Sequence, residues 1–268
     1  MKEKVFEFGK NWSRFIRVLN EDRINKAINS LKDMLIVETL SGKTFIDIGS
    51  GSGLFSLAAM KLGAKQVYSF DRDKDCVKCT MELKRRQFDN NGNWIISEGS
   101  VLDNEFLKSL GEYDIVYSWG VLHQTGAMWQ SFENIVPLVK SGGMLYIAIY
   151  NDQGRASRFW RFIKSAYNSM PKIIKLFMAV LVCIRFWFAS TIRDILKGRP
   201  FYSWRNYSSR RGMSAWYDVV DWVGGYPFEV AKPEQIFDFF KKKNFKLERL
   251  ITCGGGSGCC EYVFRKQI

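Results

Sequence analysis

Short apolar runs recur along residues 41–150, separated by longer mixed stretches. The runs at residues 45–48, 66–70, 93–96, 113–119 and 144–150 have the length of buried strands. The stretch at residues 54–62, directly after the first run, has a composition that suits a helix, and the later gaps leave room for crossover connections. Strands that alternate with helices predict a mostly parallel sheet with helices packed around it.

The chain on either side of these runs also has periodic apolar positions. Residues 1–40 place apolar side chains at three- and four-residue spacing, as amphipathic helices do, and we expect these helices to cap the ligand site. The side chains concerned are Phe15, Ile16, Leu19, Ile24, Ala27, Ile28 and Leu31. Near the other end, residues 233–243 predict a helix, and residues 245–252 and 260–265 predict two strands.

A glycine-rich turn at residues 254–258 joins these last two strands as a hairpin, so one strand should run antiparallel to the others. We therefore expect an α/β fold with a seven-stranded, mostly parallel sheet. The predicted organisation is an N-terminal helical cap, a nucleotide-binding core, a helical insertion after the fifth strand, and a C-terminal completion of the sheet. The boundaries are 1–40, 41–150, 151–230 and 231–268.

The most informative motif lies where the first strand meets the first helix of the core. Glycines occupy the alternate positions Gly49, Gly51 and Gly53, and the second strand ends in Asp71. Glycine lets backbone lie directly against a ligand, and an acid about 20 residues after such a loop can accept hydrogen bonds from ribose hydroxyls. No Lys-Ser or Lys-Thr pair follows the loop, which excludes a P-loop. The pattern therefore predicts a nucleotide-type ligand.

The spacing Asp47-x-Gly49-x-Gly51-x-Gly53 resembles motif I of the class I S-adenosylmethionine-dependent methyltransferases. The resemblance extends over residues 43–150, through the acidic junction at residues 98–103 and the strand end at residues 119–123. It implies a Rossmann-like fold and S-adenosylmethionine as the cofactor. The cofactor-binding residues that it implies are Asp47, Gly49, Ser50, Gly51, Gly53, Leu54, Asp71, Arg72, Ser100, Val101, Trp119 and Gly120.

Two further motifs resemble motifs of bacterial proteins that are grouped with ubiquinone-pathway O-methyltransferases. They are Phe8-Gly9-x-Asn11-Trp12 and the stretch at residues 224–229. This narrower resemblance implies O-methylation of a small-molecule acceptor. Two alternatives stay open: a methyltransferase that acts on nitrogen or on a phosphorylated or glycan-linked metabolite, and a non-catalytic cofactor-binding or membrane-adaptor protein on the same fold.

The insertion carries most of the charge of this 268-residue chain. Residues 152–211 hold thirteen Lys or Arg and two acids, a net of +11 against +13 for the whole chain. The same segment is rich in apolar and aromatic residues. It suits a lid or a homodimer contact, a helix on an anionic membrane surface, or a site for an anionic acceptor. Arg185 in its apolar stretch disfavours a membrane span, and no nucleic-acid-binding motif is present.

The candidate catalytic and acceptor-binding residues lie after the fourth strand and at the end of the insertion. His123, the sole histidine, is the first candidate for a general base. Asp221, Tyr226 and Glu229 are the other catalytic candidates. The acceptor-binding candidates are Arg199, Arg205, Arg210, Arg211 and Trp216. We expect no metal site, and a cytoplasmic location with peripheral membrane contact as an alternative, since no signal peptide is evident.

Overall fold

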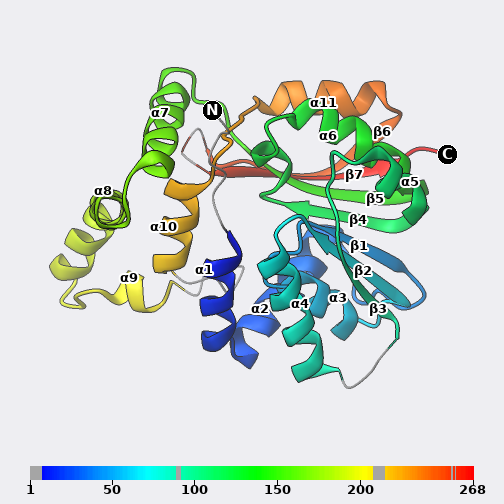
Figure 1. Cartoon of the computed structure of the whole chain (residues 1–268), viewed down its shortest axis with the longest axis horizontal. Coiled ribbons are helices and arrows are strands. Elements are labelled where there is room, and N and C mark those ends of the chain that lie inside the picture. The colour runs from blue at the N-terminus through cyan, green and yellow to red at the C-terminus, as the bar shows by residue number, and fades with distance from the viewer. Residues whose placement is uncertain (1–7, 89–91, 208–214, 255, 257) are drawn as a thin grey trace.

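The computed structural model describes residues 8–88, 92–207, 215–254, 256 and 258–268. Its centre is a seven-stranded sheet with strand order β3-β2-β1-β4-β5-β7-β6 (Figure 1). The strands are β1 Thr44–Ile48, β2 Gln66–Asp71, β3 Trp94–Glu98, β4 Tyr113–Trp119, β5 Val139–Tyr150, β6 Phe245–Ile251 and β7 Cys259–Lys266. Of these, β7 alone runs antiparallel to its neighbours, which confirms the predicted fold class.

The strand starts and ends follow the predicted apolar runs closely, except at β5. The sequence suggests a turn at Ser141-Gly142-Gly143 before this strand. In the structure β5 begins at Val139, and the pairing with β4 shifts register between Tyr113 and Ile115. Gly142 has a φ of 73°, so the glycines form an irregularity inside the strand.

The helices form a layer on each face of the sheet and a separate group beside it (Figure 1). They are α1 Phe8–Phe15, α2 Glu21–Leu35, α3 Leu54–Lys61, α4 Lys74–Gln87, α5 Asn104–Leu110, α6 Met128–Ile135, α7 Arg155–Ser169, α8 Lys172–Leu196, α9 Tyr202–Arg205, α10 Ala215–Gly224 and α11 Pro233–Lys242. Three short 3₁₀ turns cover Ile16–Val18, Leu122–Gln124 and Val136–Leu138.

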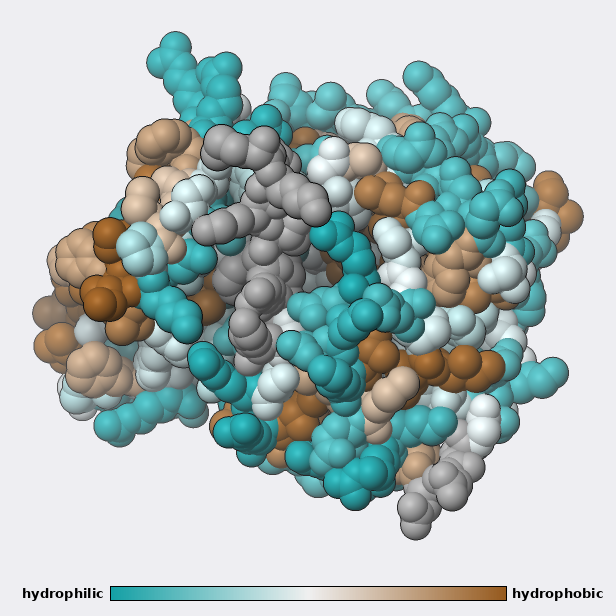
Figure 2. Space-filling model, in the orientation of Figure 1, coloured by the Kyte–Doolittle hydropathy of each residue, from teal (hydrophilic) through white to brown (hydrophobic). Residues whose placement is uncertain are grey.

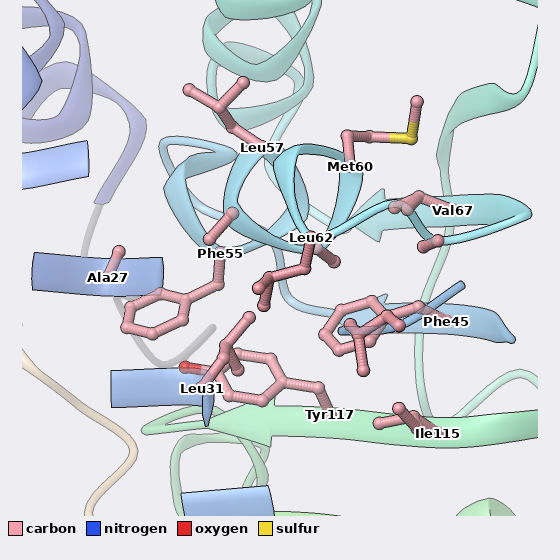
Figure 3. Packing of buried hydrophobic residues seen from close by; sticks show 14 of the residues in the cluster. Ala27, Leu31, Phe45, Phe55, Leu57, Met60, Leu62, Val67, Ile115 and Tyr117 are labelled. Carbon is pink, nitrogen blue, oxygen red and sulfur yellow. The ribbon is translucent and has the colours of Figure 1, made fainter. Parts of the chain in front are cut away.

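Alternate residues of the central strands divide the core into two apolar clusters. Phe45 and Tyr117 point to the face that α2 and α3 cover, where they stack on each other with ring centroids 5.8 Å apart (Figure 3). Ile46 and Val116, their neighbours in sequence, belong to the opposite cluster with α5, α6 and α11. This period of two is that of a sheet buried on both faces.

The group α7–α10 lies beside the carboxyl end of the sheet rather than on either face (Figure 1). It has its own small apolar cluster, built around the buried side chains Tyr167, Ala179, Val182, Val219 and Val223. Helix α1 lies between this group and α4, whereas α2 packs on α3. Of the two N-terminal helices, α1 is therefore the one placed next to the ends of the strands.

Candidate active site

The glycine loop after β1 is shaped so that backbone faces an open space. Gly49 and Gly51 have φ values of 76° and 56°, which disfavour any side chain. A Cβ on Gly49 would lie 2.4 Å from the Val121 side chain, and one on Gly51 would lie 3.1 Å from the Trp12 indole. Gly53 instead begins α3, and a Cβ there would meet Thr80 at 2.8 Å. A Cβ at any of the three would thus meet a neighbouring side chain, and of the three only Gly49 and Gly51 line the open space.

A chain of hydrogen bonds holds the strand beneath this loop. The Trp94 indole donates to Ser69 (2.8 Å), Ser69 donates to Ser56 (2.7 Å), and Ser56 donates to the buried Asp47 carboxylate (2.5 Å). Burial raises the pKa of Asp47 to about 7 against the lowering effect of the Ser56 bond. Asp47 therefore anchors the loop from below through a fixed acceptor.

Asp71 lies at the end of β2, facing the loop, as the sequence predicts. One carboxylate oxygen accepts from the backbone N–H of Gly51 (3.0 Å) and the other from that of Asp73 (2.9 Å). Burial raises the pKa of Asp71 above its ordinary value, and these backbone bonds oppose that shift. The acid thus ties the tip of β2 to the glycine loop at the edge of the same open space.

That space is a single cavity of about 1170 Å³. Ligand pockets usually measure about 300–1,000 Å³, so this cavity has room for a cofactor and a second molecule. Eleven of the twelve predicted cofactor residues line it; Gly53 does not. Its far wall comes from α8 and α10, with Arg185, Phe186, Trp187, Asp218 and Asp221 among the lining side chains.

Helix α1 closes the cavity by bridging the core and the α7–α10 group. Trp12 lines the cavity above Gly51. The Gly9 N–H donates to Asp73 (2.9 Å) in the core, and the Asn11 amide donates to Asp221 (2.8 Å) on α10. The expectation that N-terminal helices cap the site therefore fits α1.

Asp221 is the predicted catalytic residue that the structure brings to the cavity. It is half-buried, and desolvation raises the pKa of its carboxyl well above the ordinary value, while the bond from Asn11 and the charge of Lys164 oppose the rise. Asp218 also lines the cavity and accepts from the Tyr207 hydroxyl (2.7 Å). A carboxyl with a raised pKa is suited to exchange a proton near neutral pH.

His123 does not lie where a direct role as base requires. Its side chain is fully buried behind Tyr150, with ring centroids 3.9 Å apart, and Nδ1 accepts from the Tyr150 backbone N–H (3.3 Å). It is absent from the cavity lining, where Tyr150 stands instead. Burial, with Lys164 nearby, lowers the pKa of His123 to about 3. This geometry corrects the prediction from sequence: His123 supports the wall of the cavity.

Glu229 and Tyr226 also lie outside the described cavity lining. Both carboxylate oxygens of Glu229 accept from the backbone N–H of Met128, at 3.0 and 3.2 Å, at the start of α6. A carboxylate there satisfies an otherwise unpaired helix N–H and offsets the helix dipole. Glu229 is therefore a helix-capping residue in this structure.

The three predicted acceptor-binding residues that the structure describes, Arg199, Arg205 and Trp216, lie outside the cavity lining. Arg199 is exposed with its guanidinium 5.8 Å from the Tyr202 ring centre, and Arg205 is exposed on α9. Trp216 packs in the apolar cluster of α7, α8 and α10. Arg210 and Arg211 lie outside the described residues. Among the described arginines of this segment, Arg185 lines the cavity, and its place in the middle of an apolar stretch was the available signal.

Lys164 is a further residue that sequence reasoning missed. It is fully buried, donates to the backbone oxygen of Trp222, and lies 4.1 Å from the Trp222 ring centre and 4.8 Å from that of Phe228. Burial lowers its pKa to about 7, against the opposing charge of Asp221. Helical spacing places Lys164 on the same face of α7 as the buried Ser157, Tyr167 and Asn168, so the periodicity of α7 was the available signal.

Among the described residues, no group of three or more His, Cys, Asp or Glu is arranged to hold a metal ion. The prediction of S-adenosylmethionine from the sequence depends on the glycine loop and Asp71. The site can hold an elongated ligand along the strand ends and a second molecule against α8 and α10.

A family model and its named relatives match the core of this chain, but not the chain as a whole. Residues 26–148 match the family model described as ribosomal protein L11 methyltransferase. A relative with that name from Helicobacter hepaticus is 30% identical over 114 residues, which is 42% of this chain and 34% of the relative. The chain spans about a third or less of the length of such relatives. The match ends before α7, so it covers the cofactor half of the cavity.

Solved structures match over nearly the whole chain at low identity. Magnesium protoporphyrin IX methyltransferase from Synechocystis PCC 6803, with bound SAH, has a TM-score of 0.52 at 14% identity and covers 94% of this chain and 85% of its own. The [4+2]-cyclase SpnF has a TM-score of 0.54 at 10% identity, over 91% and 81%. These matches establish the Rossmann-like methyltransferase fold. Since one neighbour is named a cyclase, fold alone does not give the reaction.

Proposed function

We propose that this chain, which has the class I S-adenosylmethionine-dependent methyltransferase fold, transfers a methyl group from S-adenosylmethionine to an oxygen of a small-molecule acceptor. One observation carries the proposal: a single cavity joins the glycine loop and Asp71 to a half-buried carboxyl, Asp221, on the far wall. The narrower resemblance to ubiquinone-pathway enzymes remains a prediction. We propose a cytoplasmic location for the reaction.

The residues of the core fit the cofactor. Gly49 and Gly51 leave bare backbone where a Cβ would collide, and Asp71 presents carboxylate oxygens to ribose hydroxyls at the edge of the cavity. Trp119 and Trp12 add aromatic walls. The bound cofactor supplies an electrophilic methyl on a sulfonium, so the protein has to align the acceptor and manage its proton.

The far wall suits an acceptor that combines a ring or chain with a polar group. Phe186, Trp187 and Tyr150 offer apolar surface, and Arg185 offers a positive charge to an anionic group. Asp221 takes the proton of an acceptor hydroxyl in this proposal, and Asn11 holds the carboxylate in place. Tyr207 holds Asp218 in the same way.

A second candidate is methylation of a protein amine, which the family description of residues 26–148 favours. The relatives are named for ribosomal protein L11, and their match to this chain stops before the α8 and α10 wall. That wall encloses the acceptor end of the cavity, which supports a small acceptor over a folded protein. A non-catalytic binding protein remains the third alternative.

Calorimetric titration with S-adenosylhomocysteine tests the cofactor assignment. We expect one site, and Asp71→Ala should weaken binding by about 10- to 100-fold, the range for hydrogen bonds to a charged group. Asp103→Ala is the matched control, because Asp103 caps α5 by accepting from Phe106 and lies outside the cavity lining. An equal loss in both variants, or no binding by the natural chain, would refute the proposal.

Methyl transfer itself is tested with radiolabelled S-adenosylmethionine. The chain is incubated in parallel with a bacterial small-molecule and lipid extract and with purified ribosomal protein L11. Label that is released as methanol by alkaline hydrolysis of an ester, or that boron tribromide cleaves from an ether, supports an oxygen acceptor, whereas label stable to both treatments supports nitrogen. Label on the protein would support the second candidate, and cofactor binding without label in either would support the third.

A further inference from the structure

The outer face of α8 is a long apolar surface that no described part of the chain covers. By length and composition α8 is the one described helix that could cross a membrane. Its outward side chains include Ile173, Phe177, Ile184 and Phe188, which are 84%, 62%, 54% and 61% exposed. Figure 2 shows hydrophobic residues gathered at the left edge of the molecule, where Figure 1 places α8. Such a continuous patch usually marks an interaction site.

The opposite face of the same helix is firmly packed. Ala179 and Val182 are buried against α7 and α10, and Phe186 lies 5.0 Å from Trp222, centre to centre. Near the end of the helix, the buried Asp194 carboxylate accepts from both the backbone N–H (2.7 Å) and the hydroxyl (2.8 Å) of Ser203. These contacts fix α8 along the side of the molecule and leave its outer face available.

Exposed basic residues lie at both ends of this helix. Lys172 begins the helix, Arg193 lies in its last turn and Lys197 follows it, and all three are exposed. On α7, exposed Phe159 and Phe162 accompany exposed arginines. Asp194, the one acid between residues 153 and 207, is buried and bonded to Ser203, so it leaves the surface charge positive.

We propose that the outer face of α8, with its flanking lysines and arginines, docks on the surface of an anionic lipid bilayer, with the helix lying in the plane of the headgroups. Apolar side chains along one face with cations beside them are the composition of helices that bind membrane surfaces. This proposal does not depend on the reaction that the cavity performs.

The structure favours a bilayer surface over two alternatives for α8, a membrane-spanning position and contact with a second copy of the chain. A spanning helix would break the contacts of Ala179, Val182 and Asp194 and place Arg185 in hydrocarbon, at a cost of several kcal/mol on translocon-type scales. A second copy docked face to face would bring together two segments that each carry +11. A bilayer with acidic headgroups offers both an apolar layer and negative charge.

Cosedimentation with vesicles tests the proposal. We expect the full chain to bind vesicles of phosphatidylcholine with phosphatidylglycerol at low salt, and to bind pure phosphatidylcholine at least about tenfold more weakly. The variant Phe177→Ser/Ile184→Ser/Phe188→Ser should lose at least about tenfold in partitioning. Its matched control is Val18→Ser/Met81→Ser/Leu250→Ser, three exposed apolar residues at 45%, 49% and 40% on the core.

A second pair of variants tests the charge. Lys172→Glu/Arg193→Glu/Lys197→Glu should weaken binding at least about tenfold, whereas Arg17→Glu/Lys61→Glu/Lys65→Glu, which makes the same change in net charge on the core, should have a much smaller effect. Circular dichroism confirms that each variant is folded.

Four results would overturn the proposal. The first is no binding of the natural chain to anionic vesicles at low salt. The second is an equal response of the α8 variants and their controls. The third is retention of the expressed protein in membranes through alkaline carbonate, which would indicate a spanning helix. Dimerisation in ultracentrifugation that the Phe177→Ser/Ile184→Ser/Phe188→Ser variant abolishes, without vesicle binding, would assign the face to a second copy.

Discussion

The Rossmann-like core and the α7–α10 group are both rich in apolar residues but use them in different ways. In the core, Phe45, Ile46 and their neighbours are buried on both faces of the sheet. On α8, a comparable set of apolar side chains is turned outward. The core also matches a family model, which stops at residue 148. We propose a matching division of tasks, in which the core holds the cofactor and the added helices select the acceptor and set the location.

The largest expected effect comes from placing a side chain in the glycine loop, which we propose binds the cofactor. Gly51→Val should lower the affinity for S-adenosylhomocysteine by at least about 10³-fold, or about 4 kcal/mol, because the side chain would enter the cavity beside Trp12. Calorimetry measures the loss. Gly42→Val is the control, since Gly42 also has a positive φ but has nothing within 4 Å of the new Cβ and lies outside the cavity lining. Equal affinity in the two variants would contradict the site.

Stability should also differ between the two regions. Phe45→Ala, in the core, should lower the free energy of unfolding by about 3–5 kcal/mol, the usual cost of removing a buried aromatic ring. Phe188→Ala, on the outer face of α8, should change it by less than about 0.5 kcal/mol. Chemical denaturation in the absence of lipid provides both values. A large cost for Phe188 would mean that the outer face is covered in solution.

Lys164 gives the α7–α10 group a characteristic dependence of stability on pH. Burial lowers its pKa to about 7 in the folded state, from about 10.5 in the unfolded chain. Between these values the unfolded state binds more protons, so its contribution to the free energy of unfolding rises with pH across this window. We expect Lys164→Met to flatten that rise by a few kcal/mol. Denaturation curves measured from pH 7 to pH 10 test it; an unchanged slope would contradict the burial of Lys164.

Asp47 should produce the opposite slope in the core. Burial raises its pKa from 3.8 to about 7, so the folded state binds more protons between these values and the contribution of Asp47 to stability falls as pH rises. Asp47→Asn should remove a decline of a few kcal/mol between about pH 4 and pH 7. The Glu105→Gln variant, changed at an exposed helical acid, serves as the control and should keep the decline.

The smallest expected effect distinguishes the two candidate bases. With an acceptor that the enzyme turns over, Asp221→Asn should lower kcat by about 10²-fold and leave cofactor affinity nearly unchanged. His123→Asn should change kcat by only a few fold, because the imidazole lies behind Tyr150. The opposite order of effects would restore His123 as the base.

The features that the sequence predicts are those that depend on residues close together along the chain. The strands, the glycine loop and Asp71 follow from local spacing, and eleven of the twelve cofactor residues line the cavity as a result. The hydrogen bond between Asn11 and Asp221 joins residues 210 positions apart, so no local pattern reveals it. Burial is equally non-local: His123 and the exposed arginines have ordinary neighbours in sequence and quite different surroundings in space.

The position of β7 within the sheet has a consequence for biosynthesis. β7 pairs with β5 on one side and β6 on the other, although it is the last of the seven strands to be synthesised. Until residues 259–266 have left the ribosome, the long apolar strand β5 has a free edge, and the cavity lacks the wall that Cys259 provides. Free apolar edges invite pairing with other chains. We therefore expect the nascent chain to be most prone to aggregate between the synthesis of β5 and that of β7, which then covers the free edge of β5.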